Sequence, residues 1–350
     1  MKKITSIIIS VIFGILLIIG VAYYIGIDNI LSVFKLSPKY LILFLIISFL
    51  IMFLRVLKWK FIVESHNIKV PFLSLFMYRI AGFGVSFLTP SSHVGGEPLR
   101  AYLLTKHNVK FTKAFGSVII DKAIELTLNG FFTVIFITFI VISYSFNIYL
   151  KLFLLLNLFL IIFLISVFYW RTIHGTGFFL FFYEMLRFDK FKLTKKIKKY
   201  IIDLDKNTVK LFYQSRAYFP LAFITHLVTW LLSLVEYQLI LLMLGYKVNL
   251  ITAFMIYAAT GFAYVIPIPG ALGILEITQS LVTHIIRLKP EVGFAISFII
   301  RGRDGLWTLI GITYLYITKV NFIKQLLNNK LNGKEKVRNK NGKQGVENKV

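Results

Sequence analysis

Glu97 and Glu276 each follow a glycine- and proline-rich break in an apolar stretch, and this placement is the strongest sign of chemistry in the sequence. The breaks occupy residues 89–96 and 267–273. A helix interrupted at matching positions in two halves of a membrane protein marks a transport site near the bilayer midplane. The helix that restarts after such a break presents unpaired backbone N–H groups, which bind anions. A phosphodiester is therefore the expected ligand.

A second charge follows each glutamate at almost the same offset. Asp121 lies 24 residues after Glu97, and Arg301 lies 25 residues after Glu276, both inside apolar runs. Charges within the membrane are costly, so each is a functional candidate. Because the two positions correspond, we expect Asp121 and Arg301 to meet across the axis that relates the halves. They would then form either a polar cavity wall or a structural ion pair between the halves.

Further candidates surround these four charges. Arg79 lies within an apolar segment, and Arg100 follows Glu97 by three residues, where it can pair with that glutamate or with phosphate. Asp121 and Glu125 share one helix face, so their repulsion requires a neighbouring cation or proton. The alternative is structural, with the glutamates only capping helix starts. The complete predicted substrate-binding set is Glu97, Arg100, Asp121, Glu125, Glu276, Arg301, Gly95, Gly96, Gly270, Gly273 and Arg79.

Composition indicates an all-α integral membrane protein. The 350 residues are 57% hydrophobic with a mean hydropathy of +0.78, well above the roughly 45–50% apolar content of soluble domains. The apolar runs are continuous, whereas a β-barrel would alternate. The chain has no cysteine, and its six histidines follow no ligand pattern, so we expect no metal site and no cofactor. The net charge of +25 favours anionic membrane lipids over nucleic acid as partners.

Charge placement predicts the topology. The basic stretch 171–216, the Lys-rich tail and both termini should be cytoplasmic, in the plasma membrane. This parity holds only if two broken pairs re-enter from opposite faces, which predicts an inverted repeat of about six full spans and two re-entrant hairpins. The apolar segments lie near 5–25, 40–54, 72–88, 114–144, 150–170, 217–244, 249–266, 271–286 and 292–318.

The predicted domain organisation is one membrane domain over residues 1–327. Its halves span about 40–144 and 217–318, and residues 5–25 form an uncleaved first span. The basic loop 171–216 is either an amphipathic helix on the anionic leaflet or a solvated loop with helical pieces. The Lys-, Asn- and Gly-rich segment 328–350 is expected to be a disordered cytoplasmic tail.

Four motifs over about residues 5–320 resemble the lysylphosphatidylglycerol synthase transmembrane-region family, also called the flippase-like domain family. They are Arg55-x-x-Lys58-Trp59, the stretch 90–104, the stretch 117–125, and 269–276 with Arg301 and Trp307 downstream. His93 and the charged run 301–304 depart from the family pattern. Arg55, Lys58 and Trp59 are interpreted as interfacial anchors rather than as a headgroup site.

The resemblance implies lipid translocation. Multidomain members join this membrane module to a soluble aminoacyl-tRNA-dependent lysyltransferase, and 350 residues leave no room for that domain, so we expect no lysyltransferase activity. The sequence is interpreted as a flippase-like translocator for a phospholipid or lipid-linked headgroup, working by alternating access around a midplane site, and more a transporter than an enzyme. The alternatives are a membrane-embedded transferase on a lipid or polyprenyl-linked substrate, with Glu97 or Asp121 as base, and an accessory subunit of a lipid-modifying enzyme.

Overall fold

The computed structural model describes residues 16, 18–33, 37–89, 95–143, 147–188, 192–214, 217–265 and 268–318, and within these residues all regular structure is helical. Among the described helices, four are long and apolar enough to cross a membrane. They are α3 (Pro38–Glu64), α6 (Phe111–Ser143), α7 (Ile148–Ile173) and α10 (Phe219–Met243). The expected all-α membrane fold is confirmed. The expected first span falls largely outside the described residues, as does the tail.

Two groups of four helices follow one another with the same pattern of lengths. The first group is α3, α4 (Phe72–Leu88), α5 (Glu97–Leu104) and α6, with 27, 17, 8 and 33 residues. The second group is α10, α11 (Leu250–Val265), α12 (Ile274–Ile285) and α13 (Pro290–Ile317), with 25, 16, 12 and 28 residues. Each half is thus a long helix, a broken hairpin of two short helices, and a second long helix.

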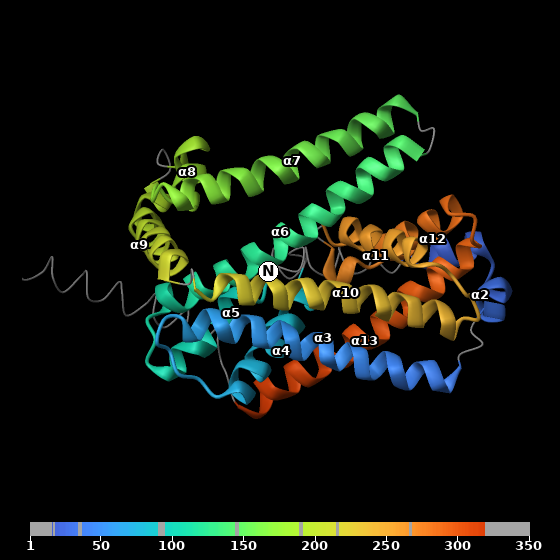
Figure 1. Ribbon diagram of the computed structural model, residues 1–350, viewed down its shortest axis with the longest axis horizontal. Helices are drawn as coiled ribbons and strands as arrows, with labels where there is room; N and C mark the ends of the chain where they lie inside the picture. Colours follow the sequence, from blue (N-terminus) through green and yellow to red (C-terminus); the bar gives the residue numbers. More distant parts are fainter. Residues whose placement is uncertain are drawn as a thin grey trace, which may run out of the picture.

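The packing between the halves is reciprocal. Helices α3 and α10, which correspond to each other, lie side by side along their length, while α4 packs against α13 and α11 against α6 (Figure 1). The α4–α5 hairpin lies toward the end of the molecule where α3 ends, and α12 lies toward the opposite end, near α2 (Ile27–Val33) (Figure 1). This arrangement agrees with the predicted inverted repeat.

The end of α4 contacts the turn that interrupts the second hairpin. The 3-10 turn η3 (Pro269–Ala271) packs on the end of α4, where a Cβ placed on Gly270 would lie 3.0 Å from the Phe87 ring. Gly270 has a φ of +55°, in the left-handed region where glycine carries no steric penalty. The end of α4 and the turn η3 therefore meet, and η3 is buried, so protein covers its irregular backbone.

Glycine at position 96 is required by a close approach within the first hairpin. A Cβ there would lie only 1.8 Å from the carbonyl oxygen of Gly82 on α4. The Gly96 N–H also donates to Ser86 Oγ at 2.7 Å, which satisfies one backbone donor at the helix break. The start of α5 is consequently held against α4.

The structure lengthens one expected element and forms two helices in the basic loop. Helix α3 continues ten residues beyond the predicted end of the second apolar segment at residue 54 and reaches Glu64. The basic loop forms α8 (Phe178–Met185) and α9 (Lys192–Gln214), and the buried Leu211 docks α9 on α6 at Gly116. The Asp205 carboxylate accepts three backbone N–H groups at the start of α8, at 2.7–3.1 Å, and so caps that helix.

Candidate functional site

A buried carboxylate on α6 is the centre of the first half's polar interior. Asp121 is 0% exposed, and Glu125 lies one turn further along the same face of the helix. An isolated ionised carboxylate in such a place would be strongly unfavourable, so it requires cations and hydrogen bonds nearby. The other three helices of the half supply them.

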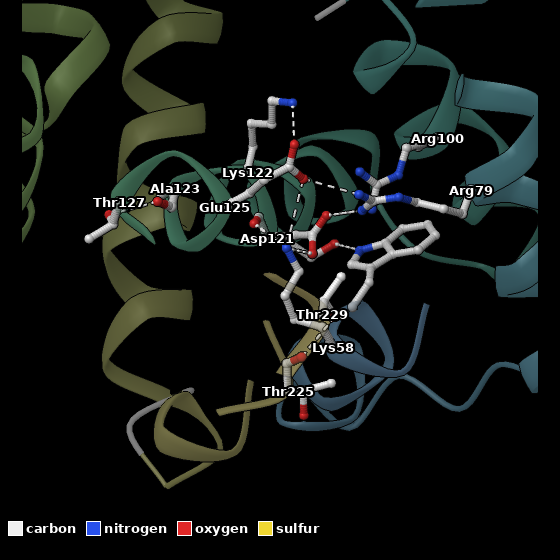
Figure 2. Close-up of polar contacts among 12 residues, drawn as sticks. Lys58, Arg79, Arg100, Asp121, Lys122, Ala123, Glu125, Thr127, Thr225 and Thr229 are labelled. Carbon is white, nitrogen blue, oxygen red and sulfur yellow. Dashed lines mark hydrogen bonds and ion pairs between the residues drawn. The ribbon is translucent and has the colours of Figure 1, made fainter. Parts of the chain in front are cut away.

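Three cations from three different helices converge on Asp121 (Figure 2). Lys58 Nζ of α3 lies 3.0 Å from Oδ1, Arg79 Nη1 of α4 lies 2.5 Å from Oδ2, and Arg100 Nη2 of α5 lies 2.8 Å from Oδ2. Lys58 Nζ also donates to the Asp121 backbone carbonyl at 3.0 Å. We call the group formed by Lys58, Arg79, Glu97, Arg100, Asp121, Lys122 and Glu125 the inner charge cluster. It ties α3, α4, α5 and α6 together.

Glu125 and Glu97 extend the inner charge cluster. Glu125 accepts from Arg79 Nη2 at 3.1 Å and from Lys122 Nζ at 2.8 Å. Glu97 has a weaker contact, with Lys122 Nζ 3.8 Å from its Oε1. Its Oε2 is buried and has no hydrogen-bond partner among the described residues. The expected like-charge repulsion between Asp121 and Glu125 is relieved by shared cations, as the sequence required.

Cations outnumber carboxylates in this region, with four around three. Arg55, one turn before Lys58, adds a fifth positive charge that interacts electrostatically with Glu125, and its buried Nε has no hydrogen-bond partner in the described part of the chain. His226 of α10 lies within electrostatic range of Lys58 and Glu125, and both its ring nitrogens are buried and likewise unpartnered. Excess positive charge with unsatisfied donors is the arrangement that an anionic group such as phosphate completes.

Arg301 in the second half is bound to its own hairpin. Its Nε and Nη2 donate to the two carboxylate oxygens of Glu276, the latter at 2.8 Å. Nη1 donates to the Gly270 carbonyl at 2.7 Å, and Nη2 also donates to the Ala271 carbonyl at 2.9 Å. Arg301 therefore neutralises Glu276 and satisfies the carbonyls that the helix break exposes.

The expected ion pair between Asp121 and Arg301 is wrong. Each charge is neutralised within its own half, because the hairpin helix that follows each break packs directly on the long helix after it. The signs are reversed between the halves. In the first half the hairpin helix supplies the cation, Arg100, to a carboxylate on the long helix. In the second half the hairpin helix supplies the carboxylate, Glu276, to a cation on the long helix.

Two further ion-paired groups, Glu276–Arg301 and Glu236–Arg303–Asp304, are together called the outer charge cluster. Arg303 Nη1 lies 2.5 Å from Glu236 of α10, and Arg303 Nη2 lies 2.9 Å from Asp304. The cation that pairs with Asp304 is Arg303, and the other carboxylate oxygen of Asp304 accepts from the Tyr264 hydroxyl at 3.2 Å. This cluster has three carboxylates and two cations, so its balance is acidic.

The two clusters lie at similar distances from opposite ends of the antiparallel pair formed by α3 and α10. Lys58 is six residues before the end of α3, about 9 Å along the helix axis, and Glu236 is seven residues before the end of α10, about 10 Å. Helices α3 and α10 run in opposite directions (Figure 1). A polar group crossing the bundle would thus meet a cation-rich cluster on one side and an acid-rich cluster on the other.

The structure gathers most of the predicted site residues into these clusters. Arg79, Arg100, Asp121 and Glu125 are bonded together, and Glu97 joins them through Lys122. The remaining predicted glycines lie at the hairpins, with Gly95 in the turn before α5 and Gly273, at φ +78°, capping the start of α12. His93 lies outside the described residues.

Sequence reasoning missed Lys58 as a site residue. The interpretation of Lys58 and Trp59 as interfacial anchors is wrong, because both are 0% exposed. Trp59 packs its ring 4.2 Å from the Arg100 guanidinium and places its indole N–H near Ser117 Oγ at 3.4 Å. The motif Arg55-x-x-Lys58-Trp59 could have indicated a buried Lys58 only if the helix had been predicted to continue to Glu64, because Lys58 then lies inside the helix and not at its end.

Comparison with known proteins gives a consistent result. Residues 7–311 match the family described as "Lysylphosphatidylglycerol synthase TM region". A UPF0104 membrane protein of Methanocaldococcus jannaschii is 26% identical over 311 residues, covering 85% of this chain and 90% of the relative. Another, from Pyrococcus horikoshii, is 21% identical over 312 residues, covering 83% and 90% respectively. A third, from Methanothermobacter thermautotrophicus, is 34% identical over 92 residues, which is 26% of this chain and 27% of the relative.

Proposed function

Because this chain belongs to the lysylphosphatidylglycerol synthase TM-region family, we propose that it translocates a phospholipid or a lipid-linked polar headgroup across the membrane. The headgroup moves by alternating access between the inner and outer charge clusters. Both termini face the cytoplasm of the plasma membrane, and the inner charge cluster opens toward that side. The basic α8–α9 region then lies on the anionic cytoplasmic leaflet.

The cation excess of the inner charge cluster carries this proposal. A buried network that served only to hold helices together would balance its charges, because an uncompensated buried charge is costly. Here five cations, counting the partly buried Arg55, face three carboxylates, and Glu97, Arg100 and His226 retain buried polar atoms without hydrogen-bond partners among the described residues. An anionic headgroup satisfies both the charge and the donors, while Glu97 offers an acceptor for a hydroxyl or amine of the same headgroup.

The contact between the end of α4 and η3 gives a physical basis for alternating access. The first hairpin contacts the inner charge cluster through Arg100, and the second contacts the outer charge cluster through Glu276. Phe87 and Gly270 meet where the hairpins touch. Movement of one hairpin tip is thereby linked to the other, so that one cluster closes as the other opens.

A reconstituted vesicle assay tests the proposal. Purified protein in vesicles that contain a fluorescent phospholipid should move the label between leaflets, measured by an impermeant quencher, and leave the mass of the lipid unchanged. Arg55→Gln should fold normally, because Arg55 forms no ion pair within the described residues, yet should slow translocation severalfold. Arg287→Gln, an exposed position with the same change of charge, is the matched control and should behave as wild type.

Three other results would contradict the proposal. A change in the mass of the labelled lipid would indicate a membrane-embedded transferase. In that case Glu97 is the better base, since Asp121 is already bonded to three cations. Translocation that appears only after a second protein is added would indicate an accessory subunit. Equal activity in Arg55→Gln and Arg287→Gln would remove the inner charge cluster from the pathway.

A further inference from the structure

A separate basic cavity of about 320 Å³ lies where α9 packs on the start of α6. It is lined by His66, Asn67, Lys113, Asn207, Lys210, Leu211 and Gln214. Its volume is at the small end of the range for ligand pockets, roughly 300–1,000 Å³. Lys113 lies eight residues before Asp121 on α6, about 12 Å along the axis, so this cavity is distinct from the inner charge cluster.

The charge of the cavity is positive. Lys113 and Lys210 approach it from two different helices, and no carboxylate is among its lining residues. Neither lysine forms an ion pair within the part of the chain that the structure describes. Lys113 Nζ donates to the His66 carbonyl at 3.1 Å, which holds the ammonium at the cavity wall. Two carboxylates of the same elements are bound elsewhere, since Glu64 pairs with Lys60 at 3.5 Å and Asp205 accepts from the backbone N–H groups at the start of α8.

The neutral lining residues add polar groups held by hydrogen bonds and one buried apolar side chain. Gln214 hydrogen-bonds the His66 ring, and Asn207 Nδ2 donates to the Asp203 carbonyl at 2.6 Å and to Thr112 Oγ1 at 3.3 Å. Leu211 is buried against Gly116 and forms the apolar base. Burial lowers the pKa of His66 to about 4, with Lys113 acting in the same direction, so His66 is neutral at pH 7 and acts there through hydrogen bonds.

We propose that this cavity binds a phosphate group through Lys113 and Lys210, carried either by an anionic lipid headgroup or by a soluble phosphate. The two ammonium groups neutralise the phosphate charge and donate to its oxygens. The residues that line the cavity belong to α6, α9 and the segment after α3, and α9 and the end of α3 lie at one end of the bundle (Figure 1). This binding does not depend on the proposed translocation, because the site has its own residues.

The test compares two double variants of the full chain in nanodiscs. Lys113→Gln with Lys210→Gln removes the cavity cations, and Lys199→Gln with Lys206→Gln removes two exposed lysines of α9 outside the cavity. Inorganic phosphate binding is measured by calorimetry in phosphatidylcholine nanodiscs. Retention of phosphatidylglycerol is measured by native mass spectrometry. The cavity variant should lose about tenfold or more in affinity for at least one ligand, while the control keeps both.

The pattern of loss identifies the source of the phosphate. Loss of phosphatidylglycerol retention alone indicates a lipid headgroup, and loss of inorganic phosphate binding alone indicates a soluble ligand. Unchanged binding of both ligands in the cavity variant would overturn the proposal, as would equal losses in the cavity and control variants. If the double variant fails to fold, Lys210→Gln alone is used, because this exposed side chain has no ion pair in the described part of the chain to lose.

Discussion

Replacing Asp121 by Asn removes the charge that holds three buried cations in place. Lys58, Arg79 and Arg100 bind that carboxylate at 2.5–3.0 Å, and Lys58 is fully buried. Breaking a buried ion pair by removal of one partner typically costs about 3–5 kcal/mol. After the substitution, Glu125, at 3.8 Å, is the one anionic partner that Lys58 keeps among the described residues. We therefore expect Asp121→Asn to lower the free energy of unfolding by about 3–5 kcal/mol.

A double-mutant cycle identifies the partner. Lys58→Met replaces the ammonium by an apolar side chain, so Asp121→Asn with Lys58→Met leaves fewer unpaired charges than Asp121→Asn alone. The double variant should be more stable than the sum of the single effects by about 0.5–3 kcal/mol. Asp121→Asn with Arg301→Gln should be additive within roughly 0.5 kcal/mol, because the two charges share no partner.

The measurement is equilibrium unfolding in detergent micelles, followed by tryptophan fluorescence. Trp59 is a local reporter, since its ring stacks on Arg100. A loss below about 1 kcal/mol for Asp121→Asn would show that water compensates the cluster and that the burial argument fails. Recovery of stability in the variant that combines Asp121→Asn with Arg301→Gln would show that the two halves share one network, which contradicts the assignment of each charge to its own hairpin.

Three further outcomes are expected. Gly96→Ala should lower the free energy of unfolding by about 1–3 kcal/mol or more, because its Cβ would lie 1.8 Å from a backbone oxygen of α4. Gly302→Ala, whose Cβ would have no atom within 4 Å, should be neutral or stabilising. Thermal unfolding of the two variants tests this difference. Burial lowers the pKa of His66 from 6.5 to about 4, so between these pH values the unfolded chain binds a proton that the folded protein does not, and stability falls as the pH drops from 6.5 to 4. His66→Gln should show a smaller fall in stability. Parallel pH profiles of wild type and His66→Gln would refute this prediction. Single cysteines at the exposed Asn108 and Lys289 should react with an impermeant thiol reagent from the cytoplasmic and the outer side respectively, and labelling of both from one side would exclude opposed hairpins.

Several features were readable from the sequence because they depend on local composition and order. The apolar content and continuous runs fixed the membrane class, and the glycine- and proline-rich breaks before Glu97 and Glu276 located both hairpins. Charge parity then predicted that the hairpins enter the membrane from opposite faces, and in the structure α4–α5 and α12 lie toward opposite ends of the bundle (Figure 1). The shared face of Asp121 and Glu125 follows from helical periodicity alone.

Only the tertiary structure decided which charges pair. Sequence symmetry placed Asp121 and Arg301 at corresponding positions, but correspondence in a repeat does not imply contact. Each long helix packs first on the hairpin of its own half, so Asp121 receives Arg100 and Arg301 receives Glu276. Lys58 reaches the same carboxylate from 63 residues away, a separation for which no local pattern gives a signal. Long-range packing of helices determines such contacts, and one chain's composition and spacing do not encode it locally.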